Sequence, residues 1–224
     1  MTYSIIQMNT NNYDKTFDCL DDDAHRKILF TDVNRQVRNW EQRKVTTNSE
    51  YPFDSVFKVR WNPFNFTDTD YSIWLDGSIK VTGSLKKYIE LMVKSGADFA
   101  TLKHPFRDNI FAEYFEWCRI RNYDKNRAFQ WMYHMMQNGW NPKNKGLYQV
   151  TVCIFKNTKR IREFGEAVIK ELHTFNGEHL ERLDQTVITY LLMTRFRDIK
   201  VLELSENMYK FGPALKLIWD HPAK

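Results

Sequence analysis

Short apolar runs alternate with longer segments of helical periodicity along this chain. The first two runs, 3–8 and 27–31, are each followed by residues rich in Asn and Asp, which is typical of strands that end in polar loops. Runs of the same kind predict further strands at 72–75, 99–102, 149–155 and 201–204. Because helical segments lie between many of them, the pattern predicts an α/β fold with a mostly parallel sheet.

Helices are predicted where apolar residues recur every three or four positions. Residues 85–93 carry such a stripe, and the remaining predicted helices are 109–121, 125–138, 160–175 and 180–193. Gly139 and Pro142 mark the end of the third of these five segments. Residues 57–60 alternate apolar with basic side chains, so we expect a strand that carries Lys58 and Arg60 on one face.

Length and composition predict one folded domain over residues 1–224. The chain is short enough for a single core, and we find no internal repeat and no Pro/Gly/Ser-rich linker. Its 42% hydrophobic and 15% aromatic residues are too apolar for a disordered protein. No run reaches the ~18 apolar residues of a spanning helix, and residues 1–7 lack the pattern of a secretion signal.

Cysteine usage and charge indicate the compartment and the sign of the partner's charge, but not the function. Cys19, Cys118 and Cys153 are odd in number and widely spaced, which suits a reducing compartment, so we expect the cytoplasm of a bacterium or of a phage-infected cell. The net charge of +5 favours anionic partners. Nucleotide-sugars, anionic membranes and nucleic acid would suit it equally, as would a merely solvated basic surface.

The segment 70–78 is the first candidate site. The predicted strand 72–75 runs directly into Asp76-Gly77, which places a carboxylate at the end of a strand, where open α/β sheets bind ligands. Such a carboxylate can hold a divalent metal that bridges two phosphates, and a glycine lets the backbone approach a ligand. Asp-Gly is also a common turn, and both interpretations stay open on these residues alone.

Several further blocks accompany this segment in a fixed order. They are 11–14 (Asn-Asn-Tyr-Asp), 28–32, 40–45, 57–60, 71–78, 102–108 with Glu113 beyond, 146–148, and Arg-Leu-Asp-Gln at 182–185. In this order the chain resembles, over residues 3 to about 192, a family of small GT-A-like glycosyltransferases found in bacterial polysaccharide loci and related to plant pectin and mucilage glycosyltransferases. The resemblance implies a GT-A-type, Rossmann-like fold, with a mostly parallel mixed sheet flanked by helices.

The resemblance also implies roles for individual residues in a nucleotide-sugar-dependent hexosyl- or pentosyltransferase. Asp184 would contact the donor sugar or deprotonate the acceptor, although it could equally be a first-turn helix carboxylate. His104 and Asp108 complete the expected catalytic group. Donor binding is expected at Asn11, Tyr13, Asp32, Lys58, Arg60, Asp76, Gly77, Ser78, Lys103, Arg107 and Gln185.

The metal is the point at which the sequence departs from the family. A typical GT-A motif is Asp-x-Asp, and Ser78 stands at its third position, so Asp76 would be the motif's one carboxylate on Mn²⁺ or Mg²⁺. His221 could supply a second ligand, although a His beside a Pro near a chain end is also typical of an exposed side chain.

Three functions stay open at this point, two of which differ in the acceptor. The family favours transfer from a nucleotide-diphosphate sugar, such as a UDP-sugar, to a polysaccharide or lipid-linked glycan. The basic clusters 156–162 and 195–200 would instead suit phage-type transfer onto a hydroxymethylated base of DNA. Loss of the second motif carboxylate would suit a non-catalytic carbohydrate- or nucleic-acid-binding module. The oligomeric state is open.

Overall fold

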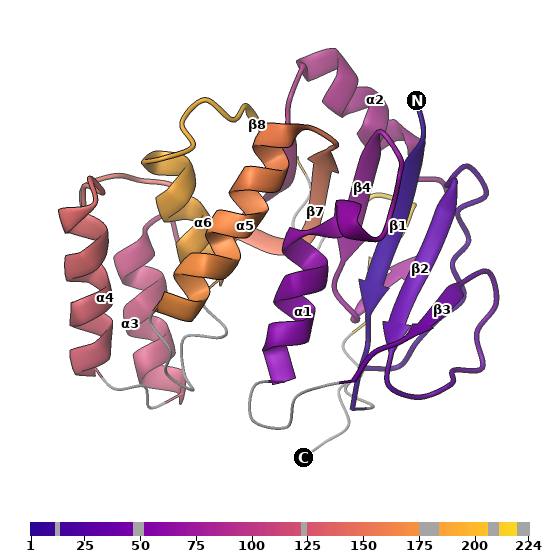
Figure 1. The fold of residues 1–224 in the computed structure, drawn as a ribbon, viewed down its shortest axis with the longest axis horizontal. Coiled ribbons are helices and arrows are strands. Elements are labelled where there is room, and N and C mark those ends of the chain that lie inside the picture. The colour runs from indigo at the N-terminus through magenta and orange to yellow at the C-terminus, as the bar shows by residue number, and fades with distance from the viewer. Residues whose placement is uncertain (12–13, 47–51, 122–124, 175–183, 206–210, 219–224) are drawn as a thin grey trace.

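The computed structural model describes residues 1–11, 14–46, 52–121, 125–174, 184–205 and 211–218, and a seven-stranded sheet lies at their centre (Figure 1). From one edge to the other its strands are β3 (Glu41–Lys44), β2 (Arg26–Thr31), β1 (Tyr3–Met8), β4 (Tyr71–Leu75), β7 (Tyr148–Lys156), β6 (Phe99–Lys103) and β8 (Val201–Leu204).

The strands of this sheet run in one direction, with the exception of β7. Strands β3, β2, β1 and β4 pair in parallel, β7 pairs antiparallel with both β4 and β6, and β8 is again parallel to β6. The carboxyl ends of β1, β2, β4 and β6 therefore share one edge of the sheet, which we call the carboxyl edge. This mixed, mostly parallel α/β sheet confirms the predicted fold class.

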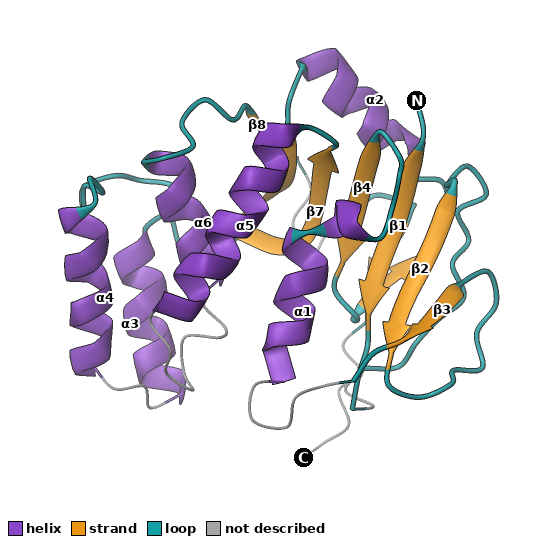
Figure 2. Cartoon of the chain, in the orientation of Figure 1, coloured by secondary structure: helices purple, strands orange, loops and turns teal. Residues whose placement is uncertain are grey.

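Helices cover both faces of the sheet (Figure 2). One face is covered by α1 (Pro52–Trp61), α5 (Lys159–Thr174) and α6 (Asp184–Met193), and α3 (Ile110–Arg121) and α4 (Lys125–Gln137) extend the same hydrophobic cluster beyond α6 (Figure 2). The other face packs against α2 (Lys86–Ser95) and a two-stranded sheet of β5 (Ile79–Val81) and β9 (Leu215–Leu217). A short 3₁₀ helix, η1 (Pro63–Asn65), follows α1. None of the helices in the described ranges is long and apolar enough to cross a bilayer.

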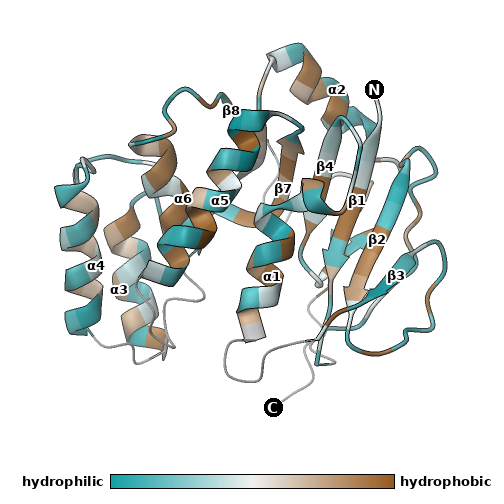
Figure 3. Cartoon of the chain, viewed as in Figure 1, coloured by the Kyte–Doolittle hydropathy of each residue, from teal (hydrophilic) through white to brown (hydrophobic). Residues whose placement is uncertain are grey.

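The hydropathy of each strand fits its place in the sheet (Figure 3). Strands β1 and β4 are buried along their whole length, because both faces of the sheet are covered there, and they are mostly apolar, with buried polar side chains at Ser4, Gln7 and Ser72. Edge strand β3 consists of four polar residues, which discourages pairing with another chain. Helix α2 ends at Gly96, whose φ of 65° is the left-handed conformation that glycine adopts readily.

The strand predicted at 57–60 is wrong, because these residues form the end of helix α1. Four alternating residues fit a strand and a helical turn almost equally, and the buried Trp61 extends the apolar face of the helix. Positions two apart point to different sides of a helix. Lys58 is accordingly exposed and pairs with Asp54 one turn earlier, whereas Arg60 is buried.

Other predicted elements agree closely with the structure. The strands at 3–8 and 201–204 have the predicted bounds, and five predicted helices correspond to α2, α3, α4, α5 and α6. Part of the segment 180–193 lies outside the described residues, and its helix is described from Asp184. Strands β3, β5 and β9 were not predicted, since they are three or four residues long and mostly polar or isolated.

Candidate active site

The acidic motif forms a turn at the carboxyl edge, directly after β4. The backbone N–H of Asp76 donates to the carbonyl of Thr151 in β7 at 2.9 Å, and that of Ile79 donates to the carbonyl of Asp76 at 2.9 Å. From β1, the buried Gln7 amide donates to the carbonyls of Asp76 (2.9 Å) and Ile79 (2.7 Å). Three elements therefore fix the direction of the Asp76 carboxylate.

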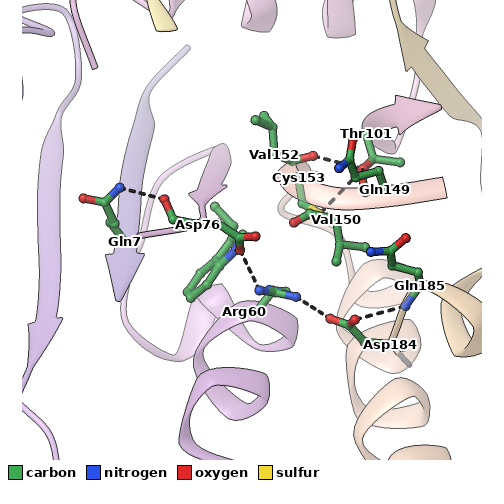
Figure 4. Close-up of polar contacts among 11 residues, drawn as sticks. Gln7, Arg60, Asp76, Thr101, Gln149, Val150, Val152, Cys153, Asp184 and Gln185 are labelled. Atoms are coloured by element: carbon green, nitrogen blue, oxygen red, sulfur yellow. Dashed lines mark hydrogen bonds and ion pairs between the residues drawn. The ribbon is translucent and has the colours of Figure 1, made fainter. Parts of the chain in front are cut away.

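An irregularity in β7 lies beside this turn. Thr101 of β6 is paired with Cys153, but the next residue, Leu102, is paired with Gln149, so residues 150–152 are extra length in β7. The buried Thr101 hydroxyl lies 2.5 Å from the carbonyl oxygen of Gln149 and 2.9 Å from that of Val152, which holds the bulge closed (Figure 4). Bulges of this kind are common beside active sites because they redirect the chain.

Arg60 joins two carboxylates that are far apart in the sequence (Figure 4). Its Nη2 donates to Asp76 Oδ1 at 2.6 Å, and its Nη1 donates to Asp184 Oδ2 at the start of α6. Trp74, on β4, donates from its indole N–H to the same Asp76 oxygen at 3.0 Å, and its ring lies 4.9 Å from the Arg60 guanidinium carbon. Asp76, Arg60 and Asp184 are hereafter the Asp–Arg–Asp triad.

Burial dominates the electrostatics of the triad. Arg60 is 7% exposed and Asp184 4% exposed. Burial raises the pKa of both carboxyl groups, and the attraction of Arg60 only partly offsets this. For Arg60 burial acts in the opposite direction, but attraction to Asp76 and Asp184 outweighs it, so the pKa of the guanidinium is raised. The triad therefore holds a permanent cation between two carboxyls that accept protons more readily than usual.

A second polar network follows β6. His104 Nδ1 accepts the backbone N–H groups of Phe106 (3.3 Å) and Arg107 (3.0 Å), so the proton of the neutral ring lies on Nε2. That nitrogen is 3.5 Å from Glu113 Oε2, and Glu113, 1% exposed, also accepts from Arg107 Nε and from the Trp117 indole at 2.7 Å. Both ring nitrogens of His104 thus face fixed partners, and the network fixes the loop that continues β6.

A third group of side chains surrounds the ends of β1 and β2. Asp32 Oδ2 accepts the backbone N–H of Asn11 at 2.8 Å, while its buried Oδ1 has no partner among the described residues. The Asn9 amide donates to the carbonyl of Asp14 at 2.6 Å and holds the loop over the motif. A Cβ added to Gly77 would lie 2.8 Å from Asp14 Oδ2 and 3.1 Å from the carbonyl oxygen of Met8, so this loop and the end of β1 approach the glycine closely.

The structure does not bring every predicted site residue to one place. Lys103 and Asp108 are exposed, and Asp108 lies 3.6 Å from Lys145. Ser78 accepts the backbone N–H of Ile218 through its carbonyl, and Gln185 donates its own N–H to Asp184 Oδ1 at 3.0 Å. Tyr13 and His221 lie outside the described residues. Sequence reasoning missed Gln7, Asn9 and Thr151, which hold the site through backbone contacts that leave no motif.

The described residues alone do not fit a divalent metal. Within them no three His, Cys, Asp or Glu side chains gather as a metal site. Asp76 Oδ1 already accepts two donors, and Ser78 replaces the second motif carboxylate. Binding of a metal by Asp76 together with His221 stays a prediction, since His221 is outside the described ranges.

The fold and site define the class of protein: a Rossmann-like α/β domain whose polar groups meet at the carboxyl ends of parallel strands. Residues 64–174 match the family model described as "TOD1/MUCI70, glycosyltransferase-like domain". The matched segment contains the motif turn, His104 and Glu113, and it confirms the resemblance that the sequence blocks indicated.

Solved structures with similar folds include mouse xyloside xylosyltransferase 1 in its apo form, with 11% identity and a TM-score of 0.48 over 91% of this chain and 85% of that one. Another is the apo structure of the WbbM bifunctional glycosyltransferase, with 13% identity and a TM-score of 0.49 over 91% of this chain and 38% of that one. No curated protein sequence matches the chain at a significant level. With TM-scores below 0.5, neither structure carries a residue role onto this chain.

Proposed function

We propose that this protein transfers a sugar from a nucleotide-diphosphate sugar to a hydroxyl group of a polysaccharide or lipid-linked glycan. The observation that carries the proposal is the Asp–Arg–Asp triad. It joins the motif after β4 to the Asp-Gln pair of α6, and these are separate blocks of the glycosyltransferase resemblance. A triad buried at the carboxyl edge suits the binding of a donor sugar whose hydroxyls need fixed polar partners.

The geometry suggests a different role for each of three carboxylates, Asp184, Asp76 and Asp32. Asp184 would act as the base that deprotonates the acceptor hydroxyl, because a raised pKa brings a carboxylate closer to the pH at which a base is most effective. Asp76, fixed by Arg60 and Trp74, would orient the donor sugar. Asp32 would accept a hydrogen bond from the nucleoside, since its buried Oδ1 lacks a partner among the described residues.

A glycan acceptor is favoured over DNA by the position of the basic clusters. Lys156, at the end of antiparallel β7, is paired with Tyr71 at the start of β4, and Val201 after the second cluster is paired with the start of β6. Clusters 156–162 and 195–200 therefore lie at the edge of the sheet opposite Asp76. Within them Arg160 is engaged with Asp198 at 2.6 Å. Phosphate contacts there would not deliver a base to the triad.

Hydrolysis and transfer assays with a panel of nucleotide-sugars, each with Mn²⁺ or with EDTA, test the proposal. We expect turnover of at least one donor, reduced by about 10²–10⁴-fold in Asp184→Asn, as removal of a positioned base predicts. Asp198→Asn, at an exposed ion pair on the opposite edge, is the matched control and should retain full turnover. If no donor is turned over, or if Asp184→Asn is fully active, the non-catalytic alternative gains.

A further inference from the structure

Lys15 and Lys80 lie against the ring of Phe17 near the motif turn, and Lys216 is paired with Lys80 across the small sheet. Lys80 lies in β5, which begins directly after Ser78, and its neighbours Ile79 and Val81 are buried on the opposite side of the strand. Lys80 therefore points away from the core. In the antiparallel register of the small sheet it lies directly opposite Lys216 of β9.

A lysine directly opposite a lysine is unfavourable in a β-sheet, because the two side chains lie on the same face at close range. Neither Lys80 nor Lys216 forms an ion pair with a residue that the structure describes. Asp18 is an acidic side chain near Lys80, and it is engaged by Arg38: the hydrogen bond from the backbone N–H of Arg38 is the main cause of its lowered pKa, and attraction to Lys80 contributes least. The like-charge pair is thus left without a dedicated counter-ion among the described residues.

The loop that follows β1 adds a third lysine and an aromatic ring. The ammonium groups of Lys15 and Lys80 lie 5.8 and 5.1 Å from the centre of the Phe17 ring. This loop is anchored, since the Trp40 indole donates to the carbonyl of Phe17 at 2.8 Å and Leu20 N–H donates to the carbonyl of Val81 at 3.3 Å. The segment that carries Phe17 is therefore held beside β5 by backbone contacts.

We propose that Lys15, Lys80 and Lys216 form a phosphate-binding site at the carboxyl edge. The anchored loop brings Asp14 against Gly77, so the site adjoins the turn that carries Asp76. The phosphate belongs either to the diphosphate of the donor, a source that rests on the proposed function, or to a phosphorylated acceptor. In both cases an anion between the lysines relieves the like-charge pair of the small sheet.

Calorimetric titration of the full chain with inorganic pyrophosphate at low salt tests the site itself. We expect Lys80→Met to weaken pyrophosphate binding about tenfold, as the loss of a charge-assisted hydrogen bond predicts. Lys94→Met in α2 and Lys170→Met in α5 remove the same charge from exposed positions elsewhere and should change it less than twofold. Equal effects of all three substitutions, or no pyrophosphate binding by the wild-type chain, would overturn the proposal.

Lys216→Glu separates binding from folding. If Lys216 has only a structural role, the substitution should not change pyrophosphate binding. If Lys216 binds phosphate, the substitution should weaken pyrophosphate binding. The substitution turns the like-charge pair with Lys80 into an opposite-charge pair, so we expect the melting temperature of the variant to rise by about 1–3 °C. Pyrophosphate binding should fall at least tenfold in the same variant. Unchanged pyrophosphate binding in this folded variant would contradict the site.

Competition then distinguishes the source of the phosphate. If UDP displaces pyrophosphate, and Lys80→Met weakens UDP but not uridine, the site holds the donor diphosphate. If UDP and pyrophosphate bind together, the phosphate belongs to the acceptor. Pyrophosphate binding without any nucleotide binding would count against the proposed nucleotide-sugar donor while leaving the phosphate site in place.

Discussion

Arg60 pairs with the buried Asp184 and with Asp76, whose side chain is 33% exposed, and its removal would leave both carboxyls without their cation. We expect Arg60→Met to lower the free energy of unfolding by about 3–5 kcal/mol, as breaking one partner of a buried ion pair does. Arg60→Lys should recover part of this loss, because a lysine ammonium can pair with one of the two carboxylates but cannot bridge both as the guanidinium does. Urea denaturation at pH 7 gives both values. Arg26→Met, at the partly exposed pair with Glu41, is the control and should cost less than about 1 kcal/mol.

His104 makes stability depend on pH. Burial lowers the pKa of its imidazole below 6.5, and attraction to Glu113 only partly opposes this. A lowered folded-state pKa means that the unfolded chain binds the proton more tightly, so this stability is present above about pH 6.5 and is lost as pH falls through the folded-state pKa.

Thermal unfolding between pH 7.5 and 5 should therefore show a falling melting temperature. His104→Asn, whose amide oxygen can still accept the backbone N–H groups of residues 106 and 107, should flatten that slope relative to the wild-type chain. An unchanged slope in His104→Asn would assign the pH dependence to other groups.

Single residues show what the sequence could predict of the site. Asp76 and Asp184 could be singled out because both stand in blocks of the family resemblance, since a common turn and a first-turn helix carboxylate would explain them locally. Arg60 was expected near the diphosphate, but it binds the two carboxylates directly, and only the packing of α1 against the sheet reveals this. Glu113 has one signal, its place in a family block, whereas Gln7 and Thr151 act on backbone groups and have none.

At the scale of elements, the contact between α1 and α5 positions Arg60. A Cβ on Gly165 would lie 1.8 Å from the carbonyl oxygen of Trp61, so no side chain fits without moving one helix. We expect Gly165→Ala to destabilise the fold by about 1–3 kcal/mol through overpacking, and to reduce donor turnover by displacing Arg60. Gly83→Ala, where the nearest atom is 3.8 Å away, should change stability by less than about 0.5 kcal/mol. Denaturation and turnover of both variants check the pair.

Elements were predictable to the extent that their own patterns were strong. Strands β1 and β4 are mostly apolar because they are buried on both faces, and helix α5 has a clear apolar stripe. Helix α1 was misread because its residues alternate over one turn. Strands β5 and β9 are held by pairing across more than a hundred residues, which no local window contains.

At the scale of the whole molecule, the two edges of the sheet differ in function. The triad, the Asp32 oxygen that has no partner among the described residues, and the two lysines beside Phe17 lie at or near the carboxyl edge. The two larger basic clusters lie at the opposite edge, where Arg160 and Arg195 are paired with Asp198 and Glu171. Charge counted from the sequence could not distinguish these edges, because strand direction decides which residues meet.

This separation predicts that non-specific DNA binding and sugar transfer respond to different substitutions. The far edge can be tested by combining three charge reversals, Lys156→Glu, Arg197→Glu and Lys200→Glu. The combined variant should bind duplex DNA more weakly. The slope of its log affinity against log salt concentration should also be shallower, by the loss of up to about three phosphate contacts. Donor turnover should stay within twofold of wild type, since these side chains are an entire strand length from Asp76. Filter binding from 50 to 200 mM salt and a turnover assay measure the two effects. Loss of both together would mean that the far edge guides the acceptor, and would favour DNA over a glycan as that acceptor.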